Sequence, residues 1–403
     1  MGRNKGLSVK QFILILMFFS LASSLLCVLL PISSQGQQAQ AATPTSFNVT
    51  NTKVLQSGDD FVHGFIYYGD YLWASTRTSP CRILKIDPDT LDYERVILDE
   101  GLNDGEDLVA ANGYIWVILC TTPSQIIRVD PQTLDWEVAV AFQNDELYDG
   151  SSLEYAFGYL WAGGCDREIA KIDLSALTYQ IYSYPTGTTG SQFHALTSGG
   201  GYLWGSCNHV CSSWCANTVV RIDPDDPTDY ASVYISSVMP DDIAYVDGYL
   251  YTGTEESPSY IYKISDNLSY SSAWASSTKC YGIFAGLDSS WGVYAGSPGT
   301  IVEFGSSLNV KAAYQLPFGF NNANEAAFDN AGNIYIICWE NPAKIVKFGC
   351  NLPSCGKEAR DNTPPLWFCI IIGLMAALIL LLVIVSYIRS RQQRVQAKPV
   401  RRD

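Results

Sequence analysis

The amino-acid sequence predicts an all-β fold, a seven-bladed β-propeller, followed by one C-terminal transmembrane helix. Three observations in the 403-residue chain support this prediction. A Tyr-Leu-Trp-like string recurs seven times at intervals of 40 to 47 residues, an alternating apolar and polar string follows each copy, and an uncharged run of 23 residues lies near the C-terminus. Repeats of this length built from short strands are typical of propeller blades, whereas β-solenoids, the alternative, have much shorter repeats.

The N-terminal segment is expected to be a signal peptide. Arg3, Lys5 and Lys10 precede an apolar run over residues 12–32, and Ala39-Gln40-Ala41 fits a small-x-small cleavage site before Ala42. We therefore assign residues 1–41 to a cleaved signal peptide. The alternative is an uncleaved N-terminal anchor.

The C-terminal segment is expected to anchor the protein in a membrane. Residues 366–388 carry no charge and are long enough to cross a bilayer. Six basic residues follow within the tail, 389–403, so the positive-inside rule places this tail in the cytoplasm. Residues 42–350 then form an extracellular propeller at the plasma membrane, and 351–365 form a juxtamembrane stalk. A buried core helix is the alternative, but it would not need basic flanks.

The charge of the predicted ectodomain excludes one class of partner. The chain has 25 Lys and Arg against 40 Asp and Glu, a net charge of −15. Without the three basic residues of the signal peptide and the six basic and one acidic residues of the tail, 16 basic and 39 acidic residues remain, a net −23. So acidic a surface argues against binding of nucleic acid, which needs clustered Lys and Arg.

The repeat predicts four strands in each blade. The aromatic anchors of the repeat are Trp73, Trp116, Trp161, Trp204, Tyr251, Trp291 and Tyr335. An inner strand A should precede the anchor strand B, and a string such as Leu-Lys-Ile-Asp-Pro at 84–88 should form strand C, which ends in an Asp-Pro turn. Segments such as 91–96 and 134–139 are expected to form the outer strand D. The last repeat lacks strand D, and residues 47–56 are expected to supply it and so close the ring.

These strings resemble the streptogramin-lyase-like and NHL-like propellers over roughly residues 47–350. In the streptogramin lyases, His and Glu on inner strands act with Mg²⁺ in an elimination. The string His63-Gly64-Phe65 is similar to their His-Gly-Ile string. Of the acidic residues that follow the Trp strand in those lyases, this chain has only Glu340, after Trp339. The resemblance implies the fold, and a lyase-like site where the residues match.

One position in the repeat stands out as a candidate site. Ten residues before each anchor the chain carries a polar residue, namely His63, Glu106, Ser151, His194, Asp241, Tyr281 and Glu325. Two residues later it carries an apolar one, namely Phe65, Leu108, Leu153, Leu196, Ile243, Ile283 and Ala327. This contrast predicts that the polar set, which we call the ring positions, faces the mouth of the central channel, while the apolar set packs between blades.

The ring positions allow three interpretations. A polar channel mouth needs no ligand, because it can hold water. Alternatively, all seven residues bind a ligand, with Glu106, Asp241 and Glu325 as candidate ligands of Ca²⁺ or Mg²⁺. In the third, His63, His194 and Glu325 are candidates for acid–base catalysis.

The cysteines are expected to form disulfides because the context is extracellular. Ten lie outside the two apolar segments: Cys81, Cys120, Cys165, Cys207, Cys211, Cys215, Cys280, Cys338, Cys350 and Cys355. The repeat favours the pairs Cys81–Cys120, Cys165–Cys207 and Cys350–Cys355. A zinc cluster of His209 with the cysteines at 207, 211 and 215 is an alternative. Asn48 and Asn267 fit glycosylation acceptor sites.

The sequence therefore predicts a membrane-anchored extracellular module that binds a protein or glycan, as a receptor, an adhesion protein or an envelope scaffold. The alternative is a propeller enzyme, a metal-assisted lyase or hydrolase that uses the ring positions. A third hypothesis is an accessory subunit that docks on another membrane protein.

Overall fold

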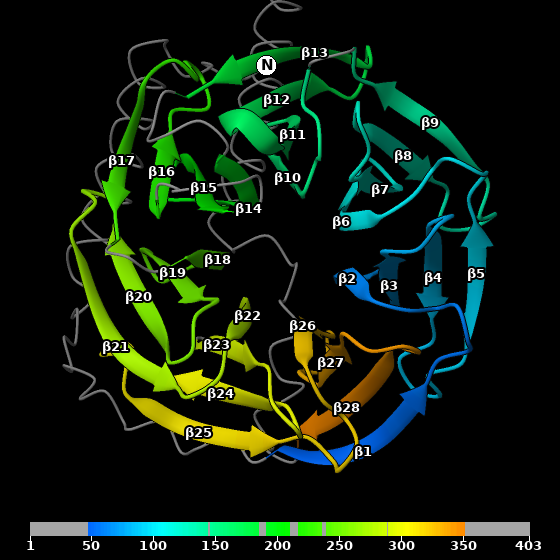
Figure 1. Cartoon of the computed structure of the whole chain (residues 1–403), viewed down its shortest axis with the longest axis vertical. Helices are drawn as coiled ribbons and strands as arrows, with labels where there is room; N and C mark the ends of the chain where they lie inside the picture. The colour runs from blue at the N-terminus through cyan, green and yellow to red at the C-terminus, as the bar shows by residue number, and fades with distance from the viewer. Residues whose placement is uncertain are drawn as a thin grey trace, which may run out of the picture. The chain divides into compact units, whose positions relative to one another are not determined.

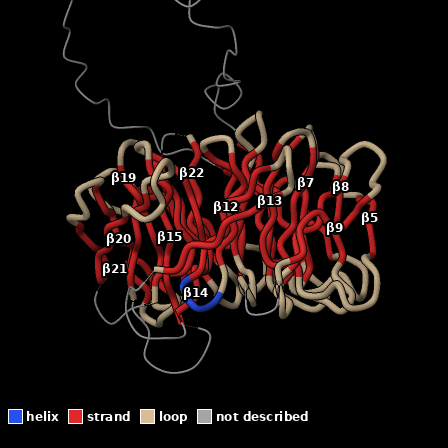
Figure 2. The backbone as a smooth tube through the Cα atoms, turned by 90° about the horizontal axis from the view of Figure 1, so that it is seen from above, coloured by secondary structure: helices blue, strands red, loops and turns tan. Residues whose placement is uncertain are grey.

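Seven four-stranded antiparallel sheets surround a central channel (Figure 1). The structure is a computed structural model that describes residues 47–143, 146–184, 191–209, 217–235, 239–287 and 289–350. Each sheet is one blade, and its first strand in chain order lies nearest the channel, except that the outer strand of the seventh blade comes from the start of the propeller. Figure 2 shows the sheets from the side, with the connecting loops at their two ends. The prediction of an all-β seven-bladed propeller is confirmed.

The blades share one strand pattern. The inner strands are β2 (Val62–Tyr68), β6 (Gly105–Ala111), β10 (Ser152–Ala156), β14 (Ser191–Gly199), β18 (Pro240–Val246), β22 (Cys280–Gly286) and β26 (Ala323–Phe328). The second strands are β3 (Tyr71–Thr76), β7 (Tyr114–Leu119), β11 (Tyr159–Gly163), β15 (Tyr202–His209), β19 (Tyr249–Thr254), β23 (Ser289–Tyr294) and β27 (Ile334–Cys338).

The outer half of each blade follows the same order. The third strands are β4 (Arg82–Ile86), β8 (Gln125–Val129), β12 (Glu168–Asp173), β16 (Thr218–Ile222), β20 (Ser259–Ser265), β24 (Thr300–Phe304) and β28 (Lys344–Cys350). The outer strands are β5 (Tyr93–Ile97), β9 (Trp136–Ala141), β13 (Thr178–Ser183), β17 (Tyr230–Tyr234), β21 (Tyr270–Ser276), β25 (Val310–Gln315) and β1 (Phe47–Val54). A 3₁₀ turn, η1 (Cys165–Arg167), precedes β12.

The ring closes through its first strand. β1 pairs antiparallel with β28, from Phe47 opposite Cys350 to Val54 opposite Lys344, and the two strands lie side by side in Figure 1. The buried ring of Phe47 packs edge-on against Trp291 of the sixth blade, with ring centroids 5.5 Å apart. This pairing covers the outer edge of β28, gives the seventh blade its fourth strand and joins the beginning of the propeller to its end.

The repeated tryptophan fixes the turn between the first two strands of a blade. Each indole Nε1–H donates to the carbonyl oxygen five residues earlier, across the turn, at 3.0–3.2 Å. The donors are Trp73, Trp116, Trp161, Trp204 and Trp291, all of them at most 1% exposed. A buried indole needs a partner for its N–H, so this bond explains why Trp recurs at this position rather than Phe.

The repeated Tyr and Lys form a clasp between neighbouring blades. The ammonium of Lys171 in β12 lies 4.2 Å from the ring centroid of Tyr159 and donates to the carbonyl oxygen of Pro224 in the next blade at 2.7 Å. Equivalent lysine bonds to the next blade are Lys85 to Pro131, Lys263 to Ser306 and Lys347 to Pro88. The recurring Tyr-x-Trp and Lys-Ile-Asp-Pro strings are thus explained by structure, since one clasp uses both.

The outer strands begin later than the sequence predicted. β5 and β9 start at Tyr93 and Trp136, and not at 91 and 134. Leu91 and Leu134 have φ of 59° and 63°, a left-handed conformation that no strand contains. The turn is extended because Asp87 Oδ1 accepts the N–H groups of Asp89 and Thr90 at 2.8 and 2.9 Å.

Two predicted disulfides are wrong. Cys81, Cys120, Cys207, Cys280 and Cys338 are in the thiol form, which excludes Cys81–Cys120 and Cys165–Cys207. Cys81 is buried among apolar residues between the first two blades, whereas Cys120 faces the channel mouth, so the two sulfur atoms point to different surroundings. The third pair, Cys350–Cys355, stays a prediction because Cys355 lies outside the described residues, as do Cys211 and Cys215 of the predicted zinc cluster.

The membrane and targeting predictions fall outside the described residues. Within the described ranges no helix is both long and apolar enough to cross a membrane. The predicted signal peptide (1–41), stalk (351–365), span (366–388) and tail (389–403) all lie in the other parts of the chain. Asn48 and Asn267 are exposed, and their glycosylation stays a prediction.

We predict that the clasp contributes more stability than a surface ion pair. Lys171→Met keeps the aliphatic stem but removes the charge, and it should lower the free energy of unfolding by about 1–3 kcal/mol. The control Lys53→Met removes an exposed pair with Asp92, 2.7 Å apart, and should cost about 0–1 kcal/mol. Chemical denaturation of the full-length chain measures both. Equal losses in the two variants would contradict the importance of the clasp.

Candidate functional site

Six of the seven ring positions line two adjoining cavities in the channel. His63, Ser151, His194, Tyr281 and Glu325 line the first, and Glu106, Ser151 and His194 line the second. Asp241, the seventh, contacts His194. Each cavity has a volume of about 70 Å³. The structure therefore brings the ring positions together, as the alternation in the inner strands predicted, and their apolar companions two residues later are all less than 9% exposed.

β-bulges turn these side chains toward the channel. The pairing between the first two strands shifts register at the ring position in five blades, for example between Val62 and Phe65 in β2 and between Pro240 and Ile243 in β18, and one residue before it, at Asn324, in β26. A bulge places two residues opposite one and so re-aims a side chain. In β6 and β18 the bulge contains the ring residue and a second acid, Asp107 or Asp242.

The second acids hold neighbouring blades together. Asp107 accepts the N–H of Leu108 at 2.7 Å and that of Leu153 in the next blade at 2.8 Å. Asp242 does the same with Ile243 and with Ile283 of the next blade, both at 2.8 Å. Burial raises the pKa of Asp107 to about 6 and that of Asp242 to about 7. These acids therefore bridge blades at the level of the cavities as well as line the first one.

The first histidine pairs with the acid of the next blade. His63 Nδ1 lies 3.2 Å from the carbonyl oxygen of Glu106 and 3.3 Å from its Oε2. Arg77 Nε lies 2.8 Å from the other carboxylate oxygen, Oε1. Burial lowers the pKa of His63 to about 3, with His194 and Arg77 adding to the effect. Burial also raises the pKa of Glu106 to about 7, against the opposing charges of Arg77 and His194. His63 is neutral at pH 7.

The second histidine repeats this pairing three blades later, but its imidazole is positively charged. His194 Nδ1 lies 2.8 Å from Asp241 Oδ1, and Asn208 Nδ2 donates to the same oxygen at 3.4 Å. Burial works to lower the pKa of His194, but the charge and hydrogen bond of Asp241 outweigh it and raise the pKa to about 9. The two imidazole rings are 5.9 Å apart, so a neutral and a charged histidine face the same mouth.

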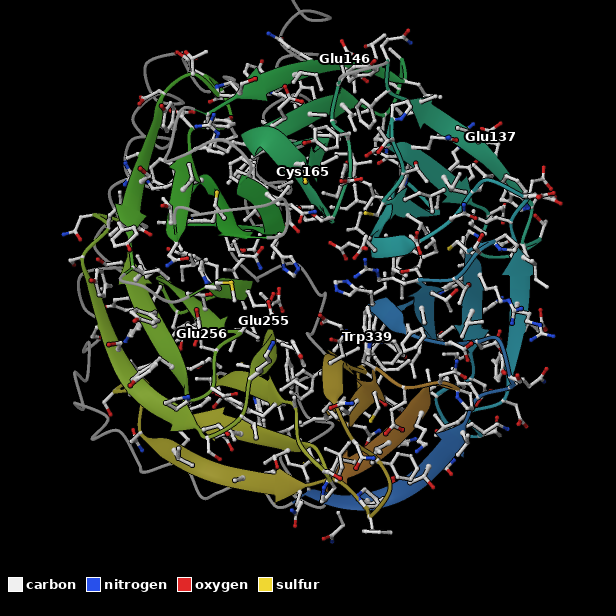
Figure 3. The ribbon with its side chains drawn as sticks, in the orientation of Figure 1. Glu137, Glu146, Cys165, Glu255, Glu256 and Trp339 are labelled. Atoms are coloured by element: carbon white, nitrogen blue, oxygen red, sulfur yellow. The ribbon has the colours of Figure 1, made fainter. Side chains whose placement is uncertain are left out.

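A second tier of residues was not recognised as a set in the sequence. Four residues after each anchor lie Arg77, Cys120, Cys165, Asn208, Glu255, Ala295 and Trp339. Arg77 contacts Glu106, Asn208 contacts Asp241, and the ring of Trp339 lies 5.4 Å from that of His63. Figure 3 labels Cys165, Glu255 and Trp339 on the inner part of the ring. Aligning the seven repeats on their anchors and comparing the residues after the anchor, as well as those before it, would have identified this tier.

The carboxylates do not fit a preformed metal centre. Glu106, Asp241 and Glu325 come from the second, fifth and seventh blades, and the first two are already paired with Arg77 and His194. In the part of the chain that the structure describes, no three His, Cys, Asp or Glu residues are grouped to hold a metal ion. The geometry therefore gives no support to Glu106, Asp241 and Glu325 as joint ligands of one Ca²⁺ or Mg²⁺.

The mouth nevertheless has an excess of acid. Among the described residues that line the cavities or pair with a lining residue, six are carboxyl groups and two are strong cations, Arg77 and His194. The acids are Glu106, Asp107, Asp149, Asp241, Asp242 and Glu325. Burial raises the pKa of Glu325 well above its usual range, and the nearby acids Asp242, Asp107 and Asp241 raise it further. A positive charge entering the mouth would reverse this effect.

Comparison with known proteins shows the fold alone. No family model and no curated protein sequence matches this chain. The virginiamycin B lyase of Staphylococcus aureus has a similar structure, with a TM-score of 0.64, 17% sequence identity, and coverage of 75% of this chain and 99% of the lyase. A catalytically inactive His-to-Ala variant of that lyase with quinupristin has a TM-score of 0.62 at 17% identity, with coverage of 75% and 99%.

WD40 propellers are similar to a comparable degree. The Neurospora crassa Pan2 WD40 domain has a TM-score of 0.59 at 9% identity, with coverage of 77% of this chain and 97% of that domain. The WD40 repeats of RRP9 have a TM-score of 0.61 at 10% identity, with coverage of 75% and 100%. One fold therefore includes both a lyase and WD40 domains, so the function must be argued from the site.

We predict that stability falls as the pH rises from 6.5 to 9. His194, with a pKa raised to about 9, keeps its proton in the folded state, whereas a histidine in the unfolded chain loses it near 6.5. Its contribution is therefore complete below pH 6.5 and lost as the pH passes about 9. Glu106 and Asp242, with pKa values raised to about 7, act in the same direction.

Thermal denaturation of the full-length chain across this interval measures the effect. His63, with a pKa of about 3, is neutral in the folded state throughout, so it adds only a small opposing rise near pH 6.5, where the unfolded histidine loses its proton. The variant His194→Gln should show a shallower decline of the melting temperature. A melting temperature that rises over the interval would contradict the assignment of charges.

Proposed function

We propose that this protein is a membrane-anchored extracellular propeller that binds a protein partner by taking a positively charged side chain of that partner into its channel mouth. The excess of carboxyl groups around the two cavities is the observation that carries this proposal. The cell-surface location rests on the sequence features at 1–41 and 366–388.

The size of the cavities supports a small charged group as the occupant. Each cavity has a volume of about 70 Å³. Because one water needs about 10–15 Å³ of such a cavity, each cavity has room for about five waters. This volume suits the end of a lysine side chain, a compact charge with three hydrogen-bond donors. Glu325 makes no ion pair among the described residues and lines the first cavity, so it is the natural acceptor.

Aromatic side chains around the mouth support a protein partner. Phe318, in the loop that leads into β26, is 96% exposed. The backbone N–H of Trp339 donates to the carbonyl of Asn322 at 2.9 Å, which joins this loop to the β27–β28 loop. Trp339 also contacts Phe61 and His63, with centroid distances of 5.6 and 5.4 Å. Aromatic residues around a charged pocket are typical of protein interfaces.

A labelled tetralysine peptide tests the proposal. We expect Glu325→Gln to weaken binding of this peptide to the full-length chain about tenfold, equivalent to about 1.4 kcal/mol. The control Glu137→Gln removes an exposed acid on the outer strand β9 (Figure 3) and should leave the affinity unchanged. Fluorescence anisotropy at physiological salt measures both.

Two results would contradict the proposal. One is the same affinity in Glu325→Gln and the wild type, which would mean that the peptide is held by the general acidity of the surface. The other is equally tight binding of a tetraglutamate peptide.

The two histidines favour an acid–base enzyme as a second candidate. A neutral and a charged imidazole 5.9 Å apart can act as base and acid, since their environments separate their pKa values. Incubation of the full-length chain with quinupristin, followed by mass spectrometry, distinguishes the candidates. Conversion of quinupristin that is lost in both His63→Ala and His194→Ala supports the enzyme, and no conversion favours the binding protein.

A further inference from the structure

The surroundings of His63 define which of its nitrogens carries the proton. Both groups near Nδ1 are oxygen acceptors, the Glu106 carbonyl at 3.2 Å and Glu106 Oε2 at 3.3 Å. A main-chain carbonyl can only accept, so Nδ1 must be the N–H of the neutral ring. Nε2, on the other side of the ring, is then a hydrogen-bond acceptor that is left for a ligand.

Arg77 keeps Glu106 in the position that this tautomer needs. Arg77 Nε lies 2.8 Å from Glu106 Oε1, so the carboxylate of Glu106 lies between the guanidinium and the imidazole, and the Glu106 side chain is only 5% exposed. The guanidinium also lies over the ring of Trp339, 5.3 Å from its centroid. Trp339 packs edge-on against His63, with ring centroids 5.4 Å apart. Arg77 therefore contacts two neighbours of His63, Trp339 and Glu106.

The second histidine provides an internal comparison. Asn208 occupies in the fourth blade the repeat position that Arg77 occupies in the first, and it contacts Asp241 as Arg77 contacts Glu106. Asn208 is 1% exposed and uncharged. Because the amide of Asn208 has no charge, the negative charge of Asp241 is balanced by His194. In the first blade, the guanidinium of Arg77 balances the negative charge of Glu106. The pairs His63–Glu106 and His194–Asp241 therefore differ mainly in the second-tier residue that contacts the acid, Arg77 in the first pair and Asn208 in the second.

We propose that Arg77 is a positioning residue that acts through Glu106 to hold His63 as the neutral Nδ1–H tautomer, so that the mouth offers one imidazole acceptor, His63 Nε2, beside one imidazolium donor, His194. The proposal deepens the proposed ligand site, on which its functional meaning rests. An incoming ammonium group would donate to His63 Nε2 and to Glu325, which line the first cavity, whereas the positive charge of Arg77 in the lining of the second cavity would direct it away from there.

Other charged groups face His63 from every neighbouring element. They are Arg77 from the β3–β4 loop, Glu106 and Asp107 from β6, His194 from β14, Asp242 from β18 and Glu325 from β26. Among these described groups, only Glu106 lies within hydrogen-bonding distance of His63 Nδ1. The tautomer therefore depends on Glu106 and on the residue that holds it.

Nitrogen NMR of the histidine side chains tests the proposal without any ligand. The chain has three histidines, so spectra of the ¹⁵N-histidine-labelled full-length chain are simple, and His63→Gln and His194→Gln assign two of the signals. At pH 7 we expect the Nδ1–H pattern for His63 and the doubly protonated pattern for His194.

Substitutions then identify the positioning residue. Arg77→Gln should remove the pure Nδ1–H pattern of His63, either by adding a proton to the ring or by mixing the two tautomers, while His194 stays doubly protonated. Asp241→Asn should convert His194 to a neutral pattern and leave His63 unchanged. The control Arg128→Gln removes an arginine that pairs with Glu137 on the outside of the second blade and should change neither signal.

Two results would overturn the proposal. One is an Nε2–H or doubly protonated His63 in the wild type at pH 7, a result that needs no variant to fold. The other is an unchanged Nδ1–H pattern in Arg77→Gln with a native circular dichroism spectrum. Because no peptide is present, this outcome is independent of the tetralysine experiment, and either can fail without the other.

Discussion

The contact between neighbouring blades is the constraint on which the site depends. At one end of the strands, the lysine clasp joins the ring of a Tyr in one blade to a carbonyl of the next, as Lys171 does with Tyr159 and Pro224. Near the channel mouth, Asp107 and Asp242 accept main-chain N–H groups from the following blade. Because these bonds fix the distance between inner strands, side chains on adjacent blades can meet.

The two histidine pairs are a direct consequence of that spacing. His63 reaches Glu106, and His194 reaches Asp241, each from one blade to the next. Since the mouth is narrow and the groups are buried, small differences between the pairs have large electrostatic effects. A guanidinium in one pair and an amide in the other accompany a histidine pKa of about 3 in the first and about 9 in the second. The same repeat unit therefore produces two chemically different groups.

The sequence predicted most of the fold and part of the site. Aromatic anchors at regular spacing defined the seven blades, and polar and apolar residues two positions apart located the channel mouth. The bulges were not predictable, because they depend on pairing with the next strand. Without the bulges, the sequence did not indicate that Asp107 and Asp242 accept main-chain N–H groups of the following blade. Two of the three predicted disulfide pairs failed, since cysteines of neighbouring blades such as Cys81 and Cys120 face different surroundings. Arg77 and Asn208 were missed because polar positions near the channel were sought only upstream of the anchors.

The most direct test of the account is the number of protons released when the tetralysine peptide binds. The acids of the mouth, among them Asp242 and Glu325, have pKa values raised by burial, so a cation entering the cavities must displace protons from them. Acids on the open surface are already ionised at pH 7 and release none. Calorimetry at pH 7 in phosphate and in Tris, which differ in ionisation enthalpy, measures this release. We expect a binding enthalpy that depends on the buffer and corresponds to net proton release, and the same enthalpy in both buffers would contradict the account.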